Sequence, residues 1–435
     1  MKGFEPRLPS ALVSDSFWHP FCDMSTVSHD GSFVLTHGDG AHVFDDAGRR
    51  YVDATAGLWF ANVGHGRRMI AEAMADQAGR LAHFSTFGDF ATPVTLDLAD
   101  RVAAIAPVPG SRVFFTSGGS DSVDTGKKMI RRYWQALGQP QRDVIIVRER
   151  AYHGMHWGGT ALAGIDANRD GYGDLGSTVV RVPWDDVAAL TQTIDQIGSD
   201  RVAAFFCEPV IGAGGVWFAG SEYLRQARTV CRQTGVLWVS DEVITGFGRT
   251  GEWFASTRWG LDPDLVLTAK GLTSGYVPMG AVLVAPSVAD VFYDGTVGVW
   301  RHGYTYSGHA VAAAAAVANL DIIESEGLVD RVRSLESVLS HTLAPLIDHP
   351  LVDDVRSGAG LLAAVALSAD HRAVDPTMSQ RVVAGLRQRG VLSRPLVDGS
   401  LQVSPPFVIA EADLLVFAAA TAEALDDVLD EGARP

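Results

Sequence analysis

The stretch DLVLTAKGLTSGYVPMGAVLV, from Asp264 to Val284, carries one charged side chain after its opening aspartate, the ammonium of Lys270. An apolar run typical of a strand precedes this lysine, and small turn-forming residues follow it. Burying an unpaired charge is costly, so a lysine in such surroundings is unusual. Lys270 therefore needs either a partner or a chemical task.

Runs of the same apolar kind recur through the middle of the chain and set the expected fold. They are continuous rather than alternating, as in strands that are buried on both faces of a sheet. Helices are expected after the glycine-rich turn that follows Thr116, as far as about Trp134, and at 221–235, between a serine and a glycine. The pattern predicts an α/β fold with a mostly parallel central sheet and helices on both faces. The expected strands are 112–116, 143–149, 202–210, 236–243, 264–270 and 280–285.

The two ends of the chain have a different pattern. Residues 36–57 predict short antiparallel strands around turns, and a long alanine-rich helix is expected to begin after about Ser307. Helix and strand patterns then alternate to the C-terminus. We expect both termini to build a smaller α+β domain, with residues 1–57 and 311–435 on either side of a large domain at 58–310.

Composition narrows the class of protein. The 435 residues are 47% hydrophobic and 20% charged, which is ordinary for a folded chain, and the net charge is -16 with no basic block. Nucleic acid is therefore an unexpected partner. The N-terminus lacks the apolar core of a signal peptide, and the run Ala310–Leu320 is too short to span a membrane. Cys22, Cys207 and Cys231 form no CxxC pair. We expect a cytoplasmic enzyme or binding protein.

Ligands of open parallel sheets bind beyond the carboxyl ends of the strands, where Lys270 is expected. Asp241 and Glu242 end another predicted strand. A lysine amine near a carboxylate in a dry cleft suits Schiff-base chemistry, because burial favours the neutral, nucleophilic amine. A pyridoxal cofactor also needs a phosphate cradle. Gly118 and Gly119, followed by Ser120 as a helix cap, would supply one at a helix N-terminus.

Several ordered motifs then give the chain a specific resemblance. They are GLWFANVGHG, SGGSDSVDT, YHG, EPVIGAGG, SDEVITGFGRTGEWF, AKGLTSGYVPMGAV, YTYSGHA and LQVSPPFV, in this order. With them the chain resembles class III aminotransferases of pyridoxal-phosphate fold type I, and more narrowly the ω-amino acid or amine:pyruvate transaminases. The resemblance implies ping-pong transfer of an amino group from an amine or ω-amino acid to pyruvate or a similar keto acid, with pyridoxal 5'-phosphate as cofactor.

The resemblance also implies a role for each residue around the cofactor. Lys270 would form the Schiff base and move the substrate proton, and Asp241 would pair with the pyridinium nitrogen. Thr305 would reach the phosphate from a second subunit, so the expected assembly is a homodimer with shared active sites, or a tetramer. The other implied cofactor contacts are Gly119 and Ser120 at the phosphate, Tyr152 and Val243 on the two faces of the ring, His153 after Tyr152, and Glu208, which would support Asp241 or the sheet end.

Substrate contacts follow from the same resemblance. Arg394 aligns with a mobile arginine that clamps the carboxylate of the acceptor, although one residue is inserted between it and the SPP segment. Ala213 stands where the ornithine and 4-aminobutyrate group has a glutamate that masks this arginine, which favours the pyruvate-coupled group. Trp59, Phe87 and Tyr152 would line the pocket. Gly88 replaces a bulky aromatic and would enlarge one side of it.

Other interpretations of these residues stay open. The same scaffold could carry an aminomutase or another pyridoxal reaction, or a non-catalytic homologue. Lys270 could be a surface lysine, and Glu242 a solvated residue. His153 and His156 have a metal-like spacing, but no acidic third ligand follows, so no metal is expected. GFGRTG, at 246–251, matches a dinucleotide motif but lacks the long apolar helix that such a site requires.

Overall fold

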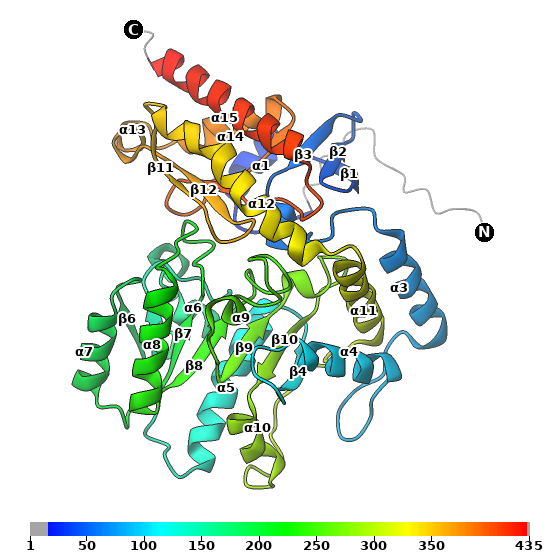
Figure 1. Cartoon of the computed structure of the whole chain (residues 1–435), viewed down its shortest axis with the longest axis vertical. Coiled ribbons are helices and arrows are strands. Elements are labelled where there is room, and N and C mark those ends of the chain that lie inside the picture. Colours follow the sequence, from blue (N-terminus) through cyan, green and yellow to red (C-terminus); the bar gives the residue numbers. More distant parts are fainter. Residues whose placement is uncertain (1–15, 177, 433–435) are drawn as a thin grey trace.

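The computed structural model describes residues 16–176 and 178–432. A seven-stranded sheet forms the centre of the larger part, which is the lower part in Figure 1. In this sheet β10 is antiparallel to both of its neighbours, and the remaining pairs are parallel. The fold class predicted from the apolar runs is therefore confirmed. In spatial order the strands are β4 (Arg112–Thr116), β10 (Gly280–Val284), β9 (Leu265–Thr268), β8 (Leu237–Asp241), β7 (Val202–Cys207), β5 (Val144–Arg148) and β6 (Val179–Val182).

The central strands are buried along their whole length and largely apolar because both faces of the sheet are covered. In β5, Ile146 packs into the cluster that contains residues of α7 and α8, whereas Ile145 and Val147 belong to the cluster with α5 and α10. Side chains of a strand alternate between faces, so two helical layers require an unbroken apolar run. The helices around the sheet are α5 (Gly119–Ala136), α6 (Trp157–Leu162), α7 (Val187–Ile197), α8 (Ser221–Thr234), α9 (Ala255–Trp259) and α10 (Pro286–Tyr293).

The N-terminal strands and the elements of the C-terminal part of the chain come together in the upper part of Figure 1. The N-terminal strand β3 pairs in parallel with the C-terminal strand β13, which joins them in one four-stranded sheet. A second, three-stranded antiparallel sheet has the order β11-β12-β14. The strands of this part are β1 (Leu35–Asp39), β2 (His42–Asp45), β3 (Arg50–Asp53), β11 (Val352–Arg356), β12 (Ala363–Leu367), β13 (Val391–Leu392) and β14 (Leu401–Val403).

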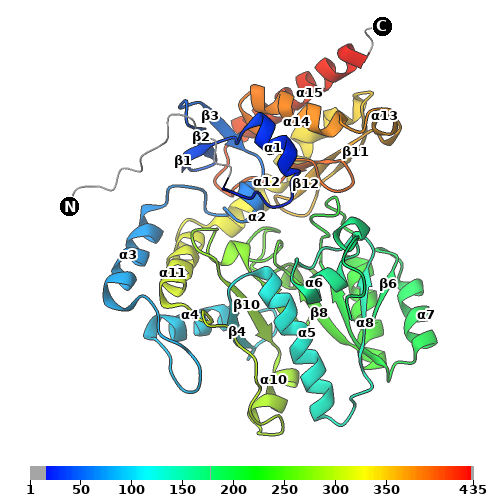
Figure 2. The same cartoon turned by 180° about the vertical axis from the view of Figure 1, so that it is seen from behind.

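The remaining helices belong to the upper part of Figure 1 or lie beside the central sheet. In both views α11 lies beside α3, to one side of the central sheet (Figures 1 and 2). The domain boundaries predicted after residues 57 and 310 stay predictions. No described helix is long and apolar enough to cross a membrane. The helices of the upper part and beside the sheet are α1 (Met24–Asp30), α2 (Ala56–Trp59), α3 (Arg68–Leu81), α4 (Pro93–Ala104), α11 (Ala310–Ser325), α12 (Leu328–Leu343), α13 (Ala369–Val374), α14 (Met378–Gln388) and α15 (Glu411–Gly432).

Details of the predicted elements differ from the structure. β9 ends at Thr268, so Lys270 lies beyond the strand instead of ending it. The cap of α5 is Gly118 rather than Ser120, which lies inside the first turn. β6 and α7 were not predicted; β6 is a four-residue strand that contains Arg181, which gives a weak apolar signal. The predicted strand 112–116 coincides with β4, and the remaining predicted strands differ from the observed ones by one to three residues at their ends.

Candidate active site

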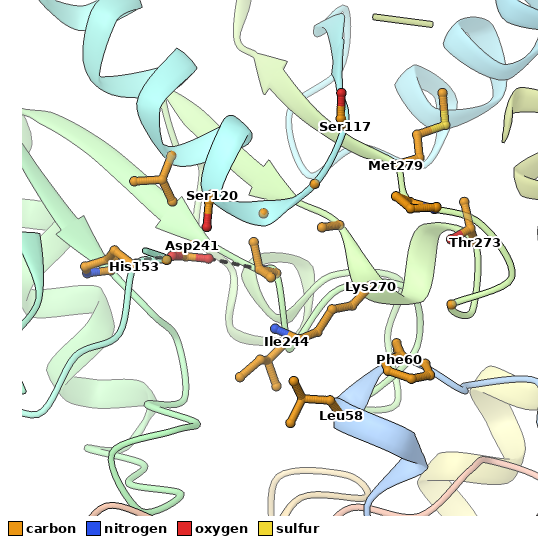
Figure 3. Close-up of a pocket in the computed structure, with 18 of the residues that line it drawn as sticks. Leu58, Phe60, Ser117, Ser120, His153, Asp241, Ile244, Lys270, Thr273 and Met279 are labelled. Atoms are coloured by element: carbon orange, nitrogen blue, oxygen red, sulfur yellow. Dashed lines mark hydrogen bonds and ion pairs between the residues drawn. The ribbon is translucent and has the colours of Figure 1, made fainter. Parts of the chain in front are cut away.

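A pocket opens at the carboxyl ends of β7, β8 and β9, where ligands of open α/β sheets bind. Figure 3 shows Lys270 extending into it toward Ile244, with Leu58 and Phe60 on the side of α2. The pocket therefore combines the sheet with the segment that links it to the N-terminal strands. Its lining includes Leu58, Phe60, Ser117, Gly118, Gly119, Ser120, Val123, Tyr152, His153, Glu208, Asp241, Val243, Ile244, Ala269, Lys270, Thr273 and Met279.

Lys270 begins a single 3-10 turn, η2 (Lys270–Leu272), two residues beyond β9. Its φ of 40° lies in the left-handed region, which is uncommon for a residue with a side chain. Burial lowers the pKa of Lys270 to about 8, against the opposing attraction of Asp241 and Glu208. A larger fraction of this amine than of an ordinary lysine is therefore neutral, and so nucleophilic, near neutral pH.

Asp241, the last residue of β8, is held from two sides. Its Oδ2 lies 2.7 Å from Nδ1 of the fully buried His153, and its Oδ1 accepts from the backbone N–H of Val243 at 3.2 Å. An ionised carboxylate can only accept, so Nδ1 of His153 carries the proton. The pair fixes the carboxylate in the pocket, where it can face a positively charged ring nitrogen.

The N-terminus of α5 forms one wall of the pocket. A Cβ added to Gly119 would lie 3.0 Å from Cγ1 of Val243, so glycine allows the backbone to approach this closely. The first N–H groups of a helix have no partner within the helix and attract anions. Ser120 Oγ accepts from the backbone N–H of Met155 at 3.0 Å, which ties the helix to the loop after His153.

Tyr152 and Glu208 also line the pocket. The Glu208 carboxylate accepts from the backbone N–H groups of Tyr152 at 2.8 Å and of Gly212 at 3.0 Å. Burial raises its pKa, with the charge of Asp241 acting in the same direction. Glu208 therefore fixes the backbone that carries Tyr152 and His153, in addition to lining the pocket itself.

Arg394 and Trp59 lie next to each other at the side of Lys270. The guanidinium carbon of Arg394 is 4.6 Å from the centre of the Trp59 ring, and Nζ of Lys270 is 5.8 Å from that centre. Burial lowers the pKa of Arg394 to about 10. The inserted residue has therefore not moved Arg394 away from the site. The backbone N–H of Val397, in the same loop, donates to the carbonyl of Ala213 at 3.4 Å.

Five predicted site residues are not among those that line the pocket: Trp59 and Arg394 lie beside Lys270, and the other three lie on the surface of the chain. Phe87, Gly88 and Thr305 are exposed and are not among the residues that line it. Phe87 lies beside Gly303, and the carbonyl of Thr305 accepts from the His83 ring at 3.0 Å. The three residues thus lie on neighbouring surface segments of this chain.

Two buried carboxylates at the end of β8 have different functions. Glu242, left open between a functional and a solvated residue, is fully buried and lies outside the pocket lining. It accepts from the backbone N–H groups of Ala255 at 2.6 Å and of Ser256 at 2.9 Å, which anchors the start of α9. The alternative of a solvated Glu242 is therefore wrong.

The pairing of His153 with Asp241 was not predicted from the sequence. The signal was present in the YHG motif, but the two residues are 88 positions apart and only the topology joins them. Phe60, Ile244, Thr273 and Met279 also line the pocket without having been singled out. No group of metal ligands occurs among the described residues, His153 and His156 included.

The arrangement fits a flat phosphorylated ring such as pyridoxal phosphate. The close approach of Gly119 to Val243 leaves a helix N-terminus open to a phosphate, Asp241 offers a fixed carboxylate, and Lys270 offers an amine with a lowered pKa. A carbonyl group on the ligand would meet the amine, and a ring nitrogen would meet the carboxylate.

Comparison with known proteins agrees with this chemistry. The putrescine–pyruvate aminotransferase of Pseudomonas aeruginosa is 36% identical over 422 residues, which cover 92% of this chain and 91% of that protein. An (S)-enantioselective omega-transaminase from Thermomicrobium roseum superposes with a TM-score of 0.91 at 38% identity, covering 95% of this chain and 96% of that one. The omega transaminase of Pseudomonas jessenii, solved in complex with PMP, has a TM-score of 0.90 at 33% identity, with 95% and 97% covered.

Residues 24–425, nearly the whole chain, match the family model of class-III aminotransferases. The match includes the segments that carry Lys270, Asp241 and Gly119. The solved relative with PMP holds the aminated form of the cofactor that these three residues fit. The chain belongs to the class-III aminotransferases, a family that depends on pyridoxal phosphate.

Proposed function

We propose that this chain moves an amino group from an amine or ω-amino acid to pyruvate or a similar small keto acid. One observation carries the proposal: Arg394 lies against Trp59, close to Lys270, and pairs with no carboxylate among the described residues. A guanidinium beside a reactive amine suits an acceptor whose carboxylate and carbonyl are adjacent. The aminotransferases named for putrescine and pyruvate and for β-alanine and pyruvate support the same assignment.

The chain's own residues supply the acid–base and electrostatic parts of the reaction. When bound, pyridoxal phosphate supplies an electrophilic carbonyl and a ring that takes up electrons. The Asp241 carboxylate would stabilise a positive charge on the ring nitrogen, and His153 holds that carboxylate in place. Lys270 accepts the proton of the substrate carbon and returns it on the other side of the exchange, which its lowered pKa suits.

We assign the binding of the acceptor carboxylate to Arg394 because no glutamate stands at position 213 to compete for it. A glutamate at position 213 would be able to pair with the arginine, but Ala213 is there. Arg394 therefore keeps its charge for the keto acid and leaves an uncharged donor to the apolar surface of Trp59. Leu58 and Phe60 extend this apolar surface on the donor side.

We further propose a homodimer with shared active sites. Phe87, Gly88 and Thr305 lie on exposed segments outside the pocket of their own chain, where they can line the pocket of a second copy. In this assembly Thr305 would contact the cofactor phosphate, and Gly88 would leave room for larger donors. The cytoplasmic location stays a prediction.

A substrate panel tests the proposal. Putrescine, β-alanine and 1-phenylethylamine are each offered with pyruvate and, separately, with 2-oxoglutarate, and alanine or glutamate is measured. We expect alanine formation with at least one donor and much slower glutamate formation. Rearrangement of an amino acid without any keto acid would instead indicate an aminomutase. The absence of both reactions in protein that binds the cofactor would indicate a non-catalytic homologue.

A further inference from the structure

Gln402, in the middle of β14, is a fully buried polar side chain that contacts Arg394. Its Oε1 accepts from Nε of Arg394 at 2.7 Å. Its Nε2 donates to the hydroxyl of Ser404 at 2.6 Å and to the carbonyl of Thr55 at 3.3 Å. A buried amide with all of these bonds satisfied is rigid, because losing any one of them leaves a polar group without a partner.

The orientation of the Gln402 amide is determined by its neighbours. Nε of Arg394 can only donate, and the carbonyl of Thr55 can only accept. A flipped amide would place donor against donor and acceptor against acceptor, so one orientation is allowed. The amide therefore links the guanidinium of Arg394 to the backbone of Thr55, which precedes the α2 segment that carries Trp59.

The Thr55 end of this link is itself fixed. Asp53 is buried, and its carboxylate accepts from the backbone N–H and the hydroxyl of Thr55 at 3.0 Å and 2.9 Å, and from the N–H of Gly57 at 2.8 Å. His65 contacts the same carboxylate at 2.9 Å. The side chain of Arg394 is thus connected, through Gln402, to the anchored backbone that presents Trp59.

The contact with Gln402 does not involve the two terminal nitrogens of the Arg394 guanidinium. Gln402 occupies Nε, and no other described residue accepts a hydrogen bond from Arg394. The two terminal nitrogens can therefore bind a carboxylate in a bidentate manner. A neutral amide orients the guanidinium without cancelling its charge, whereas a glutamate at the same place would compete with the substrate carboxylate.

We propose that Gln402 is a positioning residue that holds Arg394 against Trp59, with its terminal nitrogens available to the acceptor carboxylate. In this way it sets the preference of the site for keto acids over substrates without a carboxylate. The inference rests on the proposed function, since it assumes that Arg394 binds the acceptor. Gln402 thus acts on the specificity through Arg394, without itself touching substrate or cofactor.

The side chain of Gln402 can be changed without dismantling the loop that carries Arg394. The backbone N–H of Gln402 donates to the carbonyl of Arg394 at 3.0 Å, and that of Leu396 donates to Ser400 at 2.7 Å. Asp398 in the same loop pairs with Arg356 at 2.8 Å. A variant at position 402 therefore tests the amide rather than the loop.

The experiment compares Gln402→Leu, Gln402→Glu and Arg394→Ala in the cofactor-saturated protein. One readout is the equilibrium binding of propanoate, an unreactive carboxylate, by calorimetry. The other is single-turnover kinetics of pyruvate with the pyridoxamine form and of 1-phenylethylamine with the pyridoxal form. Cofactor absorbance and the melting temperature show whether each variant is folded. Gln402→Glu keeps the shape of the side chain, so it decides the matter if the leucine variant does not fold.

We expect Gln402→Leu to weaken the binding of propanoate and pyruvate about tenfold, because one hydrogen bond to a charged group is lost. Gln402→Glu should weaken both at least as much, through competition. The loss with 1-phenylethylamine should be several-fold smaller in each variant. Wild-type pyruvate binding in both variants, or equal losses in both half-reactions, would overturn the inference. If Arg394→Ala also keeps wild-type pyruvate binding, the proposed carboxylate role of Arg394 fails instead.

Discussion

Replacing Asp241 by asparagine removes one charge from the pocket and changes little else. Asparagine has nearly the same shape, and its amide can still bond to His153, because a neutral histidine can exchange donor and acceptor between its two nitrogens. The variant should therefore fold and keep some affinity for the cofactor. What it cannot do is stabilise a positive charge on the ring nitrogen.

The size of the effect follows from the burial of the site. Asp241 is only 5% exposed and His153 is fully buried, so water cannot replace the missing charge. Loss of one preorganised charge-stabilising group in such a site costs about 3 kcal/mol or more in the barrier. This corresponds to a rate that is lower by a factor of roughly 150. The loss should appear in the chemical step and not in substrate binding.

The assay is the single-turnover reaction of the pyridoxal form with 1-phenylethylamine, followed by the absorbance of the cofactor. Glu242→Gln is the matched control, since Glu242 is the adjacent buried carboxylate but holds α9 instead of lining the pocket. We expect the control to lower the melting temperature and to keep the rate of the half-reaction. A rate for Asp241→Asn within threefold of wild type would refute the assignment of Asp241 as the ring partner.

Three other predictions use the same site. The rate at which apoprotein bonds pyridoxal phosphate should rise between pH 7 and pH 9 with a midpoint near 8, because the pKa of Lys270 is lowered to about 8 and only its neutral amine reacts; stopped-flow absorbance that does not change with pH contradicts this. Gly119→Val should weaken cofactor binding about tenfold or more in a fluorescence titration, since even a Cβ there lies 3.0 Å from Val243; unchanged affinity would mean that the phosphate binds elsewhere. Sedimentation at assay concentration should show a homodimer or a larger assembly, and an active monomer would exclude a cofactor contact from the Thr305 of a second copy.

The central sheet could be predicted because its physical signal is local. A strand that is buried on both faces is apolar over most of its length, as β5 and β7 are, and β8 as far as Val239. The direction of a strand leaves no comparable signal, so the antiparallel orientation of β10 could not be predicted from its residues. The short strand β6 lies at the edge of the sheet, where an arginine is tolerated. This arginine interrupts the apolar run, so the strand could not be recognised from the sequence.

The features of the site likewise divide into residues with a local sequence signal and contacts that only the topology creates. Lys270 and Gly119 are recognisable because each is improbable in its local surroundings without a chemical reason. The contact of His153 with Asp241, and that of Gln402 with Arg394, depend on which strand ends meet in space. A buried glutamine in an apolar run gives no indication of its partner, so the sequence could not reveal this link.

The bond between Lys270 and the cofactor is the central claim, and the composition of the chain makes it easy to test. The sequence has only four lysines, which are Lys2, Lys127, Lys128 and Lys270. Borohydride reduction of the cofactor-saturated protein, followed by digestion and mass spectrometry, identifies the lysine that bonds pyridoxal phosphate. We expect the added mass on the peptide that contains Lys270, and none after prior conversion of the cofactor to its amine form by a donor. Added mass on one of the other three lysines, or full transaminase activity in Lys270→Ala, would contradict this mechanism.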